Sequence, residues 1–142
     1  MVDLLDKNAK REIVDAIRKA EAQTSGEIRV HLARKCREDV LGHAKKIFSK
    51  LGMHRTKRRN AVLIFVALDS RRLAILGDAG IHDRVGDFFW GGTRDKMIEY
   101  FRKDEIKEGI IAGVAGVGEK LRQHFPRHLD NPDELPDTVT EG

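Results

Sequence analysis

The stretch Arg59–Gly80, with the sequence RNAVLIFVALDSRRLAILGDAG, decides the fold of this chain. Within it, Ala61 to Leu68 form an unbroken run of eight apolar residues, rich in valine, isoleucine and phenylalanine. This length and composition are typical of a strand that is covered on both faces. Charged and turn-forming residues at 69–72 interrupt the run, and Leu73 to Leu76 resume it. Four residues are too few for a parallel crossover, so we predict an antiparallel hairpin.

The residues before this hairpin predict a helix, a strand and a second helix. Apolar side chains recur at helical spacing over residues 6–23 and again over residues 37–51. Between them, residues 27–34 alternate apolar and polar side chains, which is typical of a half-buried strand. His31 falls on the outer side of that strand, where we interpret it as a surface histidine. A strand, a helix and a strand at this spacing form a right-handed βαβ unit, so this strand should run parallel to the one that begins at Ala61.

The residues after the hairpin predict two further helices. One begins at Thr93, and the other spans about residues 104–124. Glycines inside the second helix each lower its helix propensity by about 1 kcal/mol relative to alanine. We expect them to let this helix lie close against the sheet; they are Gly109, Gly113, Gly116 and Gly118. The whole pattern predicts the α/β class, with a mixed sheet and helices on both of its faces.

The domain organisation follows from the length and from the end of the chain. At 142 residues the chain is long enough for one domain with a sizeable core. We expect that domain to cover residues 1–128. Residues 129–142 are polar and contain prolines, so we expect a partly ordered tail that Leu129 and Leu135 hold to the domain and whose last residues are loose.

Composition limits the compartment and the class of partner. No apolar run approaches the roughly 20 residues that a membrane-spanning helix needs, and no signal peptide is visible. The single cysteine, Cys36, is compatible with the reducing cytoplasm, where we expect the protein to reside. A net charge of +4 invites a nucleic-acid interpretation. We disfavour it, because the basic cluster at residues 55–59 contains none of the stacking aromatic rings that single-strand binders use.

The predicted strand directions bring polar residues to one edge of the sheet. Glu27 enters the first strand, Asn60 enters the second, and Asp78 follows the third. Asp83 and Asp87 come next, in a glycine-bounded loop. Oxygen ligands of this kind suit Ca²⁺ or Mg²⁺, because no cysteine or histidine cluster accompanies them. The alternative is that these residues solvate the loops and form turns.

Other chemistries find little support in the sequence. Phosphate-binding and dinucleotide-binding glycine motifs are missing at the start of any predicted helix, and so is the nucleophile elbow of hydrolases. The aromatic residues Phe88, Phe89 and Trp90 lie beside the only pair of adjacent glycines. We favour a packing role for them, with docking of a protein partner as the alternative.

With these segments in view, the chain resembles the TPM-domain family. This family includes thylakoid-lumen phosphatase-like proteins that are linked to photosystem II repair. The resemblance rests on the order and spacing of short matches along most of the chain. These include Thr24-Ser25-Gly26-Glu27-Ile28, Leu51-Gly52-Met53-His54, Arg59-Asn60, Ile75-Leu76-Gly77-Asp78, Gly80-Ile81, Val85-Gly86, Phe89-Trp90, His124-Phe125-Pro126 and Glu134-Leu135-Pro136-Asp137.

The resemblance implies a Rossmann-like α/β/α sandwich, divalent-cation binding and, for plant members, acid phosphatase activity. The chain is similar to the short, soluble bacterial form of the family. Two functions therefore compete. The first, which we favour, is a binding module for Ca²⁺ or Mg²⁺ that acts through an unknown protein partner. The second is a weak metal-dependent phosphatase, in which Arg59 would hold the phosphate and a cation at Asp78 would activate water.

Overall fold

The Arg59–Gly80 stretch forms the hairpin predicted from its sequence. The structure is a computed structural model that describes residues 5–86, 88–127 and 137–142. Its sheet contains the strands β1 (Glu27–Ala33), β2 (Ala61–Ala67), β3 (Arg72–Gly77) and β4 (Val139–Glu141) in the order β3-β2-β1-β4. β2 pairs antiparallel with β3 and parallel with β1, in a register that sets Glu27 opposite Ala61. Both predicted strand directions are therefore confirmed.

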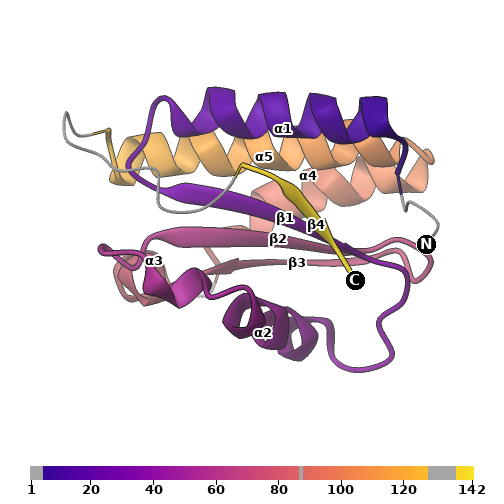
Figure 1. Ribbon diagram of the computed structural model, residues 1–142, viewed down its shortest axis with the longest axis horizontal. Coiled ribbons are helices and arrows are strands. Elements are labelled where there is room, and N and C mark those ends of the chain that lie inside the picture. The colour runs from indigo at the N-terminus through magenta and orange to yellow at the C-terminus, as the bar shows by residue number, and fades with distance from the viewer. Residues whose placement is uncertain (1–4, 87, 128–136) are drawn as a thin grey trace.

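Helices cover the sheet on both faces, as predicted for the α/β class (Figure 1). The helices α1 (Lys7–Glu21), α4 (Gly91–Arg102) and α5 (Ile106–His124) lie on one side. The helix α2 (Val40–Lys50) and the 3-10 turn η1 (Met53–Arg55) pack on the other side. The short helix α3 (Ala79–Val85) follows β3, and its buried Ile81 joins the hydrophobic cluster beneath α1, α4 and α5. The result is a three-layer sandwich around a mixed sheet.

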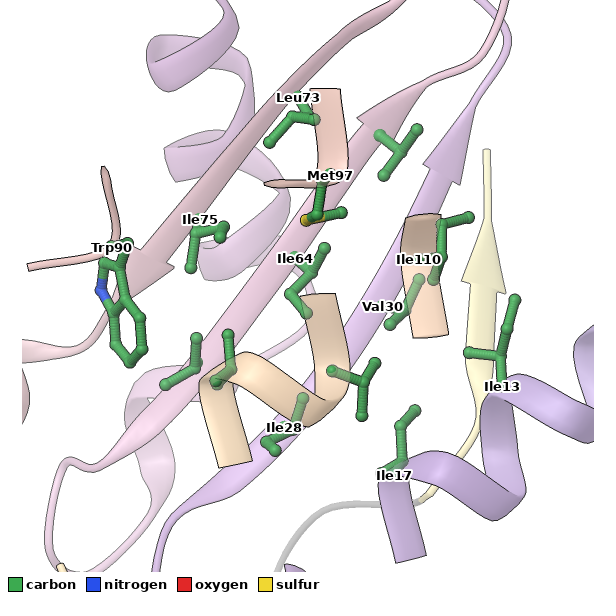
Figure 2. Packing of buried hydrophobic residues seen from close by; sticks show 14 of the residues in the cluster. Ile13, Ile17, Ile28, Val30, Ile64, Leu73, Ile75, Trp90, Met97 and Ile110 are labelled. Carbon is green, nitrogen blue, oxygen red and sulfur yellow. The ribbon is translucent and has the colours of Figure 1, made fainter. Parts of the chain in front are cut away.

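The unbroken apolar sequence of β2 reflects this double cover. Val62, Ile64 and Val66 belong to the hydrophobic cluster beneath α1, α4 and α5. The residues between them, such as Leu63 and Phe65, belong to a second cluster beneath α2. Figure 2 shows the first cluster, in which Ile64 and the neighbouring Val30 lie among side chains of the helices. A strand that is buried on both faces needs no polar alternation.

The glycines of α5 pack against helices and not against the sheet. A Cβ at Gly109 would come within 2.7 Å of Phe101 on α4, and one at Gly118 within 2.6 Å of Ala20 on α1. These glycines therefore allow α5 to approach its two neighbouring helices closely. The close packing was predicted correctly, but the sheet was the wrong packing partner. The sequence shows where a helix has small residues, but it does not show which element those residues face.

The strand β1 differs from the half-buried strand that its alternation predicts. All seven of its residues are buried, including Arg29 and His31. Around His31 the added cover comes from β4, because Val139–Glu141 pairs with Val30–Leu32. The ring of His31 bonds to this segment through both nitrogens, 2.8 Å from the Thr140 hydroxyl and 3.0 Å from the Gly142 carbonyl oxygen. The predictions of a surface histidine and of a loose chain end are therefore wrong; Leu129 and Leu135 lie outside the described residues.

The burial of His31 predicts how stability depends on pH. Burial lowers the pKa of His31 below the ordinary value of 6.5, and the charges of His43, Lys50 and Arg29 lower it further. The unfolded chain therefore binds a proton on His31 more readily than the folded chain does. The contribution of neutral His31 to stability is complete above about pH 6.5 and declines as the pH falls through that value. Urea unfolding from about pH 7.5 to about pH 5 should show the decline. The loss of stability between these pH values should be smaller in His31→Gln. It should be unchanged in the matched control His54→Gln, because His54 is exposed. An equal decline in both variants would assign the effect to other groups.

Candidate functional site

Three segments meet at the end of the sheet where β1 and β2 begin and β3 ends. We call this end the rim and define it by Glu27, Asn60 and Asp78. The amide of Glu27 donates to the carbonyl oxygen of Asn60 at 3.3 Å. The amide of Asp78 donates to the carbonyl oxygen of Ala61 at 2.9 Å. The main chain of all three residues is thus brought together as the strand directions predict.

Asp78 and Arg59 form an ion pair at the rim. The Arg59 guanidinium donates from Nε to Asp78 Oδ2 at 2.7 Å and from Nη2 to Oδ1 at 2.8 Å. The side chain of Asp78 is 5% exposed, whereas that of Arg59 is 49% exposed. The hydrogen bonds to Asp78, and then the charge of its carboxylate, raise the pKa of Arg59, so the guanidinium stays charged. Arg59 therefore covers the carboxylate from the solvent side.

Asp78 also begins the helix α3. Its Oδ1 accepts a hydrogen bond from the amide of Ala79 at 2.8 Å, and the side chain caps the helix N-terminus. Asp83, which the sequence analysis places in a loop, consequently lies on this helix and is exposed. Its charge also raises the pKa of Arg59. Asp87 lies outside the described residues.

The backbone at Arg59 is held in the left-handed region, with φ at 53°. Only glycine adopts this region without strain, and strained residues often occur at functional sites. The amide of Gly80 donates to the Arg59 carbonyl oxygen at 2.8 Å. A Cβ at Gly80 would come within 2.6 Å of that oxygen, so only glycine fits there. The start of α3 and residue 59 are therefore locked together, which fixes where the guanidinium can reach.

The other two rim side chains are buried. Asn60 is 2% exposed, and its Nδ2 donates to the carbonyl oxygen of Ser25 at 3.1 Å and to its hydroxyl at 3.2 Å. Glu27 is 3% exposed. Across residues 5–86, 88–127 and 137–142, no group of three or more histidine, cysteine, aspartate or glutamate side chains is arranged to hold a metal ion. The rim thus contains two covered carboxylates, Glu27 and Asp78, and the exposed carboxylate of Asp83 lies on α3 beside it.

Two grooves adjoin the rim, between α2 and the end of β3. The first, the Arg59 groove, has a volume of about 480 Å³ and is lined by Lys45, Ser49, His54, Arg59 and Asp78, with apolar residues beneath. The second, the Trp90 groove, has a volume of about 520 Å³ and runs past Leu41, Lys45, Leu76, His82 and Trp90. Lys45, Leu76 and Gly77 line both grooves, so the two are continuous.

A comparison with protein-family models matches the TPM domain over residues 1–120. The chain belongs to the TPM-domain family. Among solved structures, it is similar to the NMR structure of the BA42 protein from the psychrophilic bacterium Bizionia argentinensis, with 42% sequence identity and a TM-score of 0.92. That match covers 100% of this chain and 98% of the BA42 chain. The family and the fold expected from the resemblance are therefore confirmed.

Two more distant structures share the fold. The N-terminal domain of a protein from P. gingivalis has 23% identity and a TM-score of 0.71, over 88% of this chain and 82% of that one. The N-terminal domain of the cg2496 protein from Corynebacterium glutamicum has 13% identity and a TM-score of 0.66, over 98% and 82%. No curated protein matches the chain. Within the described part of this TPM domain, no helix has the length and apolar character of a membrane span.

The three aromatic residues proposed for docking have different surroundings in this TPM domain. Trp90 is 7% exposed and belongs to the core cluster of Figure 2. Phe89 packs edge-on against Trp90, with ring centroids 4.7 Å apart, and Lys120 lies over its face. Phe88 is 93% exposed. Phe88 is thus the most exposed of the three, whereas Trp90 is accessible only where it lines the Trp90 groove.

Sequence reasoning missed Lys45 and His54 as lining residues of the Arg59 groove. Both are exposed, and nothing in their local pattern separates them from other solvated charges. The available signal was helical spacing, because Leu41, Lys45 and Ser49 recur every four residues on α2 and so share one face. That this face borders β3 depends on the packing of the helix across the sheet, which spacing alone does not give.

Proposed function

We propose that this TPM domain is a non-catalytic interaction module whose rim responds to Ca²⁺ or Mg²⁺. The observation that supports this most directly is the Arg59–Asp78 pair, in which a half-exposed guanidinium covers a buried carboxylate. A cation that takes Asp78 must displace Arg59, and the freed guanidinium then changes the charge at the mouth of both grooves. Binding of a small ion would in this way be converted into a change at a surface that a partner contacts, in the expected setting of the cytoplasm.

The rim fits a divalent cation in part. Asp78 and Asp83 would hold it, because carboxylate oxygens are the ligands that Ca²⁺ and Mg²⁺ prefer. Both oxygens of Asp78 already accept hydrogen bonds from Arg59, so the site is closed until that side chain leaves. Two carboxylates fall short of the roughly six to eight oxygens that Ca²⁺ takes, so carbonyl oxygens and water would complete the shell. The hydrogen bonds from Asn60 to Ser25 use Nδ2, so its Oδ1 stays a further candidate ligand, together with Glu27 and Asp87.

Removal of the competing guanidinium should strengthen cation binding. In Arg59→Gln we expect calcium affinity to rise by about tenfold, because a positive charge in contact with the ligand carboxylate is lost. In Asp78→Asn we expect it to fall by at least about tenfold. The measurement is a calcium and magnesium titration followed by NMR shifts of the amides of Ala79, Gly80 and Asp83.

The matched control is Arg55→Gln, which removes the same charge from an exposed position on η1. It should bind calcium as the unaltered chain does. Equal affinities in Arg59→Gln and Arg55→Gln would mean that only net charge matters and that the ion pair does not gate the rim. If millimolar calcium and magnesium leave the amides of residues 78–83 unshifted in every variant, the cation part of the proposal is wrong.

A weak phosphatase is the second candidate, and the lining of the Arg59 groove favours it. Lys45, His54 and Arg59 place basic groups around one groove, next to the carboxylate of Asp78. Such groups would hold a phosphate and stabilise negative charge that develops on it. Hydrolysis of p-nitrophenyl phosphate with and without added metal tests this function. Activity that persists unchanged in Asp78→Asn would not arise from the rim.

A further inference from the structure

Among the strands of the described residues, only β2 pairs with β3, so the other edge of β3 is open (Figure 1). Ala61 and Asp78 are opposed in the β2–β3 register, and the amide of Asp78 donates to Ala61. In an antiparallel ladder the bonded residues alternate, so those of β3 that bond to β2 are Arg72, Ala74 and Leu76. The amides and carbonyl groups of Leu73, Ile75 and Gly77 consequently face away from β2.

Two of these three residues, Ile75 and Gly77, border a groove that a ligand can enter. The side chains of Leu73 and Ile75 are both buried, with 3% and 8% of their surface exposed. Ile75 and Gly77 line the Trp90 groove, and no main-chain hydrogen bond to another described segment occupies their outward groups. Unpaired main-chain groups at the floor of a groove are the feature that extended peptides recognise when they add a strand to a sheet.

The walls of the Trp90 groove supply side-chain contacts of two kinds. On α2, Leu41 is 41% exposed, although it is a large apolar residue, and Lys45 lies one turn further along. Across the groove stands Trp90, which is 7% exposed and lines the groove wall; its indole nitrogen is not one of the fully buried atoms of the described residues that lack a hydrogen-bond partner. Its Nε1 lies 3.6 Å from the point where a Cβ would stand on Gly77. In Figure 2 the nitrogen is on the side of the ring turned away from Ile64 and Met97.

We propose that the Trp90 groove binds a short, extended acidic peptide as an additional strand beside β3. The peptide main chain pairs with Ile75 and Gly77, and one of its carbonyl oxygens accepts the Trp90 N–H. An apolar side chain of the peptide rests on Leu41, and an acidic one pairs with Lys45. An acidic peptide is favoured because the chain carries a net charge of +4 and Lys45 lines the groove from α2; Asp83 lines it from α3, and the Arg59–Asp78 pair at its mouth is neutral as a whole. This inference names the partner class of the interaction module proposed above and rests on that role, but not on cation binding.

The test uses the full chain and two synthetic peptides with blocked ends, TEVEVET and its charge-reversed form TKVKVKT. TEVEVET should shift the amides of Ile75 and Gly77 and the indole N–H of Trp90 in NMR titrations. Lys45→Glu should weaken its binding by about tenfold, because attraction at the groove becomes repulsion. The matched control Lys96→Glu, an exposed position on α4 outside the groove, should alter it by less than about twofold. Trp90→Phe keeps a ring but removes the N–H, and should weaken binding severalfold.

Two outcomes overturn this inference. One is that millimolar TEVEVET leaves the amides of Ile75 and Gly77 unshifted; the other is that TKVKVKT binds as tightly as TEVEVET. The titration is run in EDTA and again with calcium, so that the two proposals fail separately. Peptide binding in EDTA without any calcium response would leave this inference standing and remove only the cation part of the proposed function. A calcium response without peptide binding would remove this inference and leave the cation part of the proposed function standing.

Discussion

Replacement of Phe65 by alanine should lower the free energy of unfolding by about 3–5 kcal/mol. Phe65 lies at the centre of β2 and is fully buried in the cluster beneath α2. Its ring stacks on His31, with centroids 6.0 Å apart, and contacts His43 at 4.7 Å. The truncation therefore removes apolar burial and leaves a cavity between the sheet and α2, because neighbours in a packed core relax only in part. Urea unfolding followed by circular dichroism measures the change.

The matched control is Phe88→Ala, which makes the same substitution at a side chain that is 93% exposed. It should change stability by no more than about 0.5 kcal/mol. A similar loss in both variants would mean that the two phenylalanines are equally buried and would contradict the two-sided cover of β2. A small loss in Phe65→Ala alone would mean that α2 collapses into the cavity without much cost.

The central hairpin was predictable because its signal is local. The apolar run of β2 and the four-residue interruption before Leu73 are properties of consecutive residues. The cover of His31 in β1 was not predictable in this way, because it comes from β4, which pairs with Val30–Leu32 from more than 100 positions along the chain. Three residues are too short to show a strand period. The alternation in β1 was therefore interpreted as exposure, although Arg29 and His31 are buried.

The sequence predicts that three chain segments come together at the rim, but it does not predict which of their side chains contact each other. Strand direction alone brings Glu27, Asn60 and Asp78 to one end of the sheet, since the register of main-chain pairs fixes where strands begin and end. Which side chains then contact each other depends on local geometry. The left-handed backbone of Arg59 and the cap of α3 at Asp78 create the ion pair. A sequence contains no direct sign of a positive φ at an arginine, because glycine and asparagine are the residues that usually mark it.

Replacement of Asn60 by alanine should cost about 2 kcal/mol of stability. The Asn60 amide is nearly inaccessible and joins the entry of β2 to the entry of β1 through the carbonyl oxygen and the hydroxyl of Ser25. Without it, these buried acceptors lose their donor where water does not readily replace it, and an unsatisfied buried group costs roughly 1–3 kcal/mol. Asn8→Ala, at an exposed position on α1, is the matched control and should change stability by less than about 0.5 kcal/mol.

A second substitution at the same position separates the hydrogen bond from packing. Asn60→Asp keeps the size of the side chain but sets a carboxylate against the Ser25 carbonyl oxygen, so at neutral pH it should cost more than Asn60→Ala. A protonated carboxyl group can donate that hydrogen bond, which raises the folded pKa of the new residue above its unfolded value near 3.9. The folded state then binds the extra proton, and the deficit relative to the unaltered chain should shrink as the pH falls through the raised pKa. A deficit that stays constant from neutral to mildly acidic pH would mean that Asn60 contributes shape at the rim and not a donated hydrogen bond.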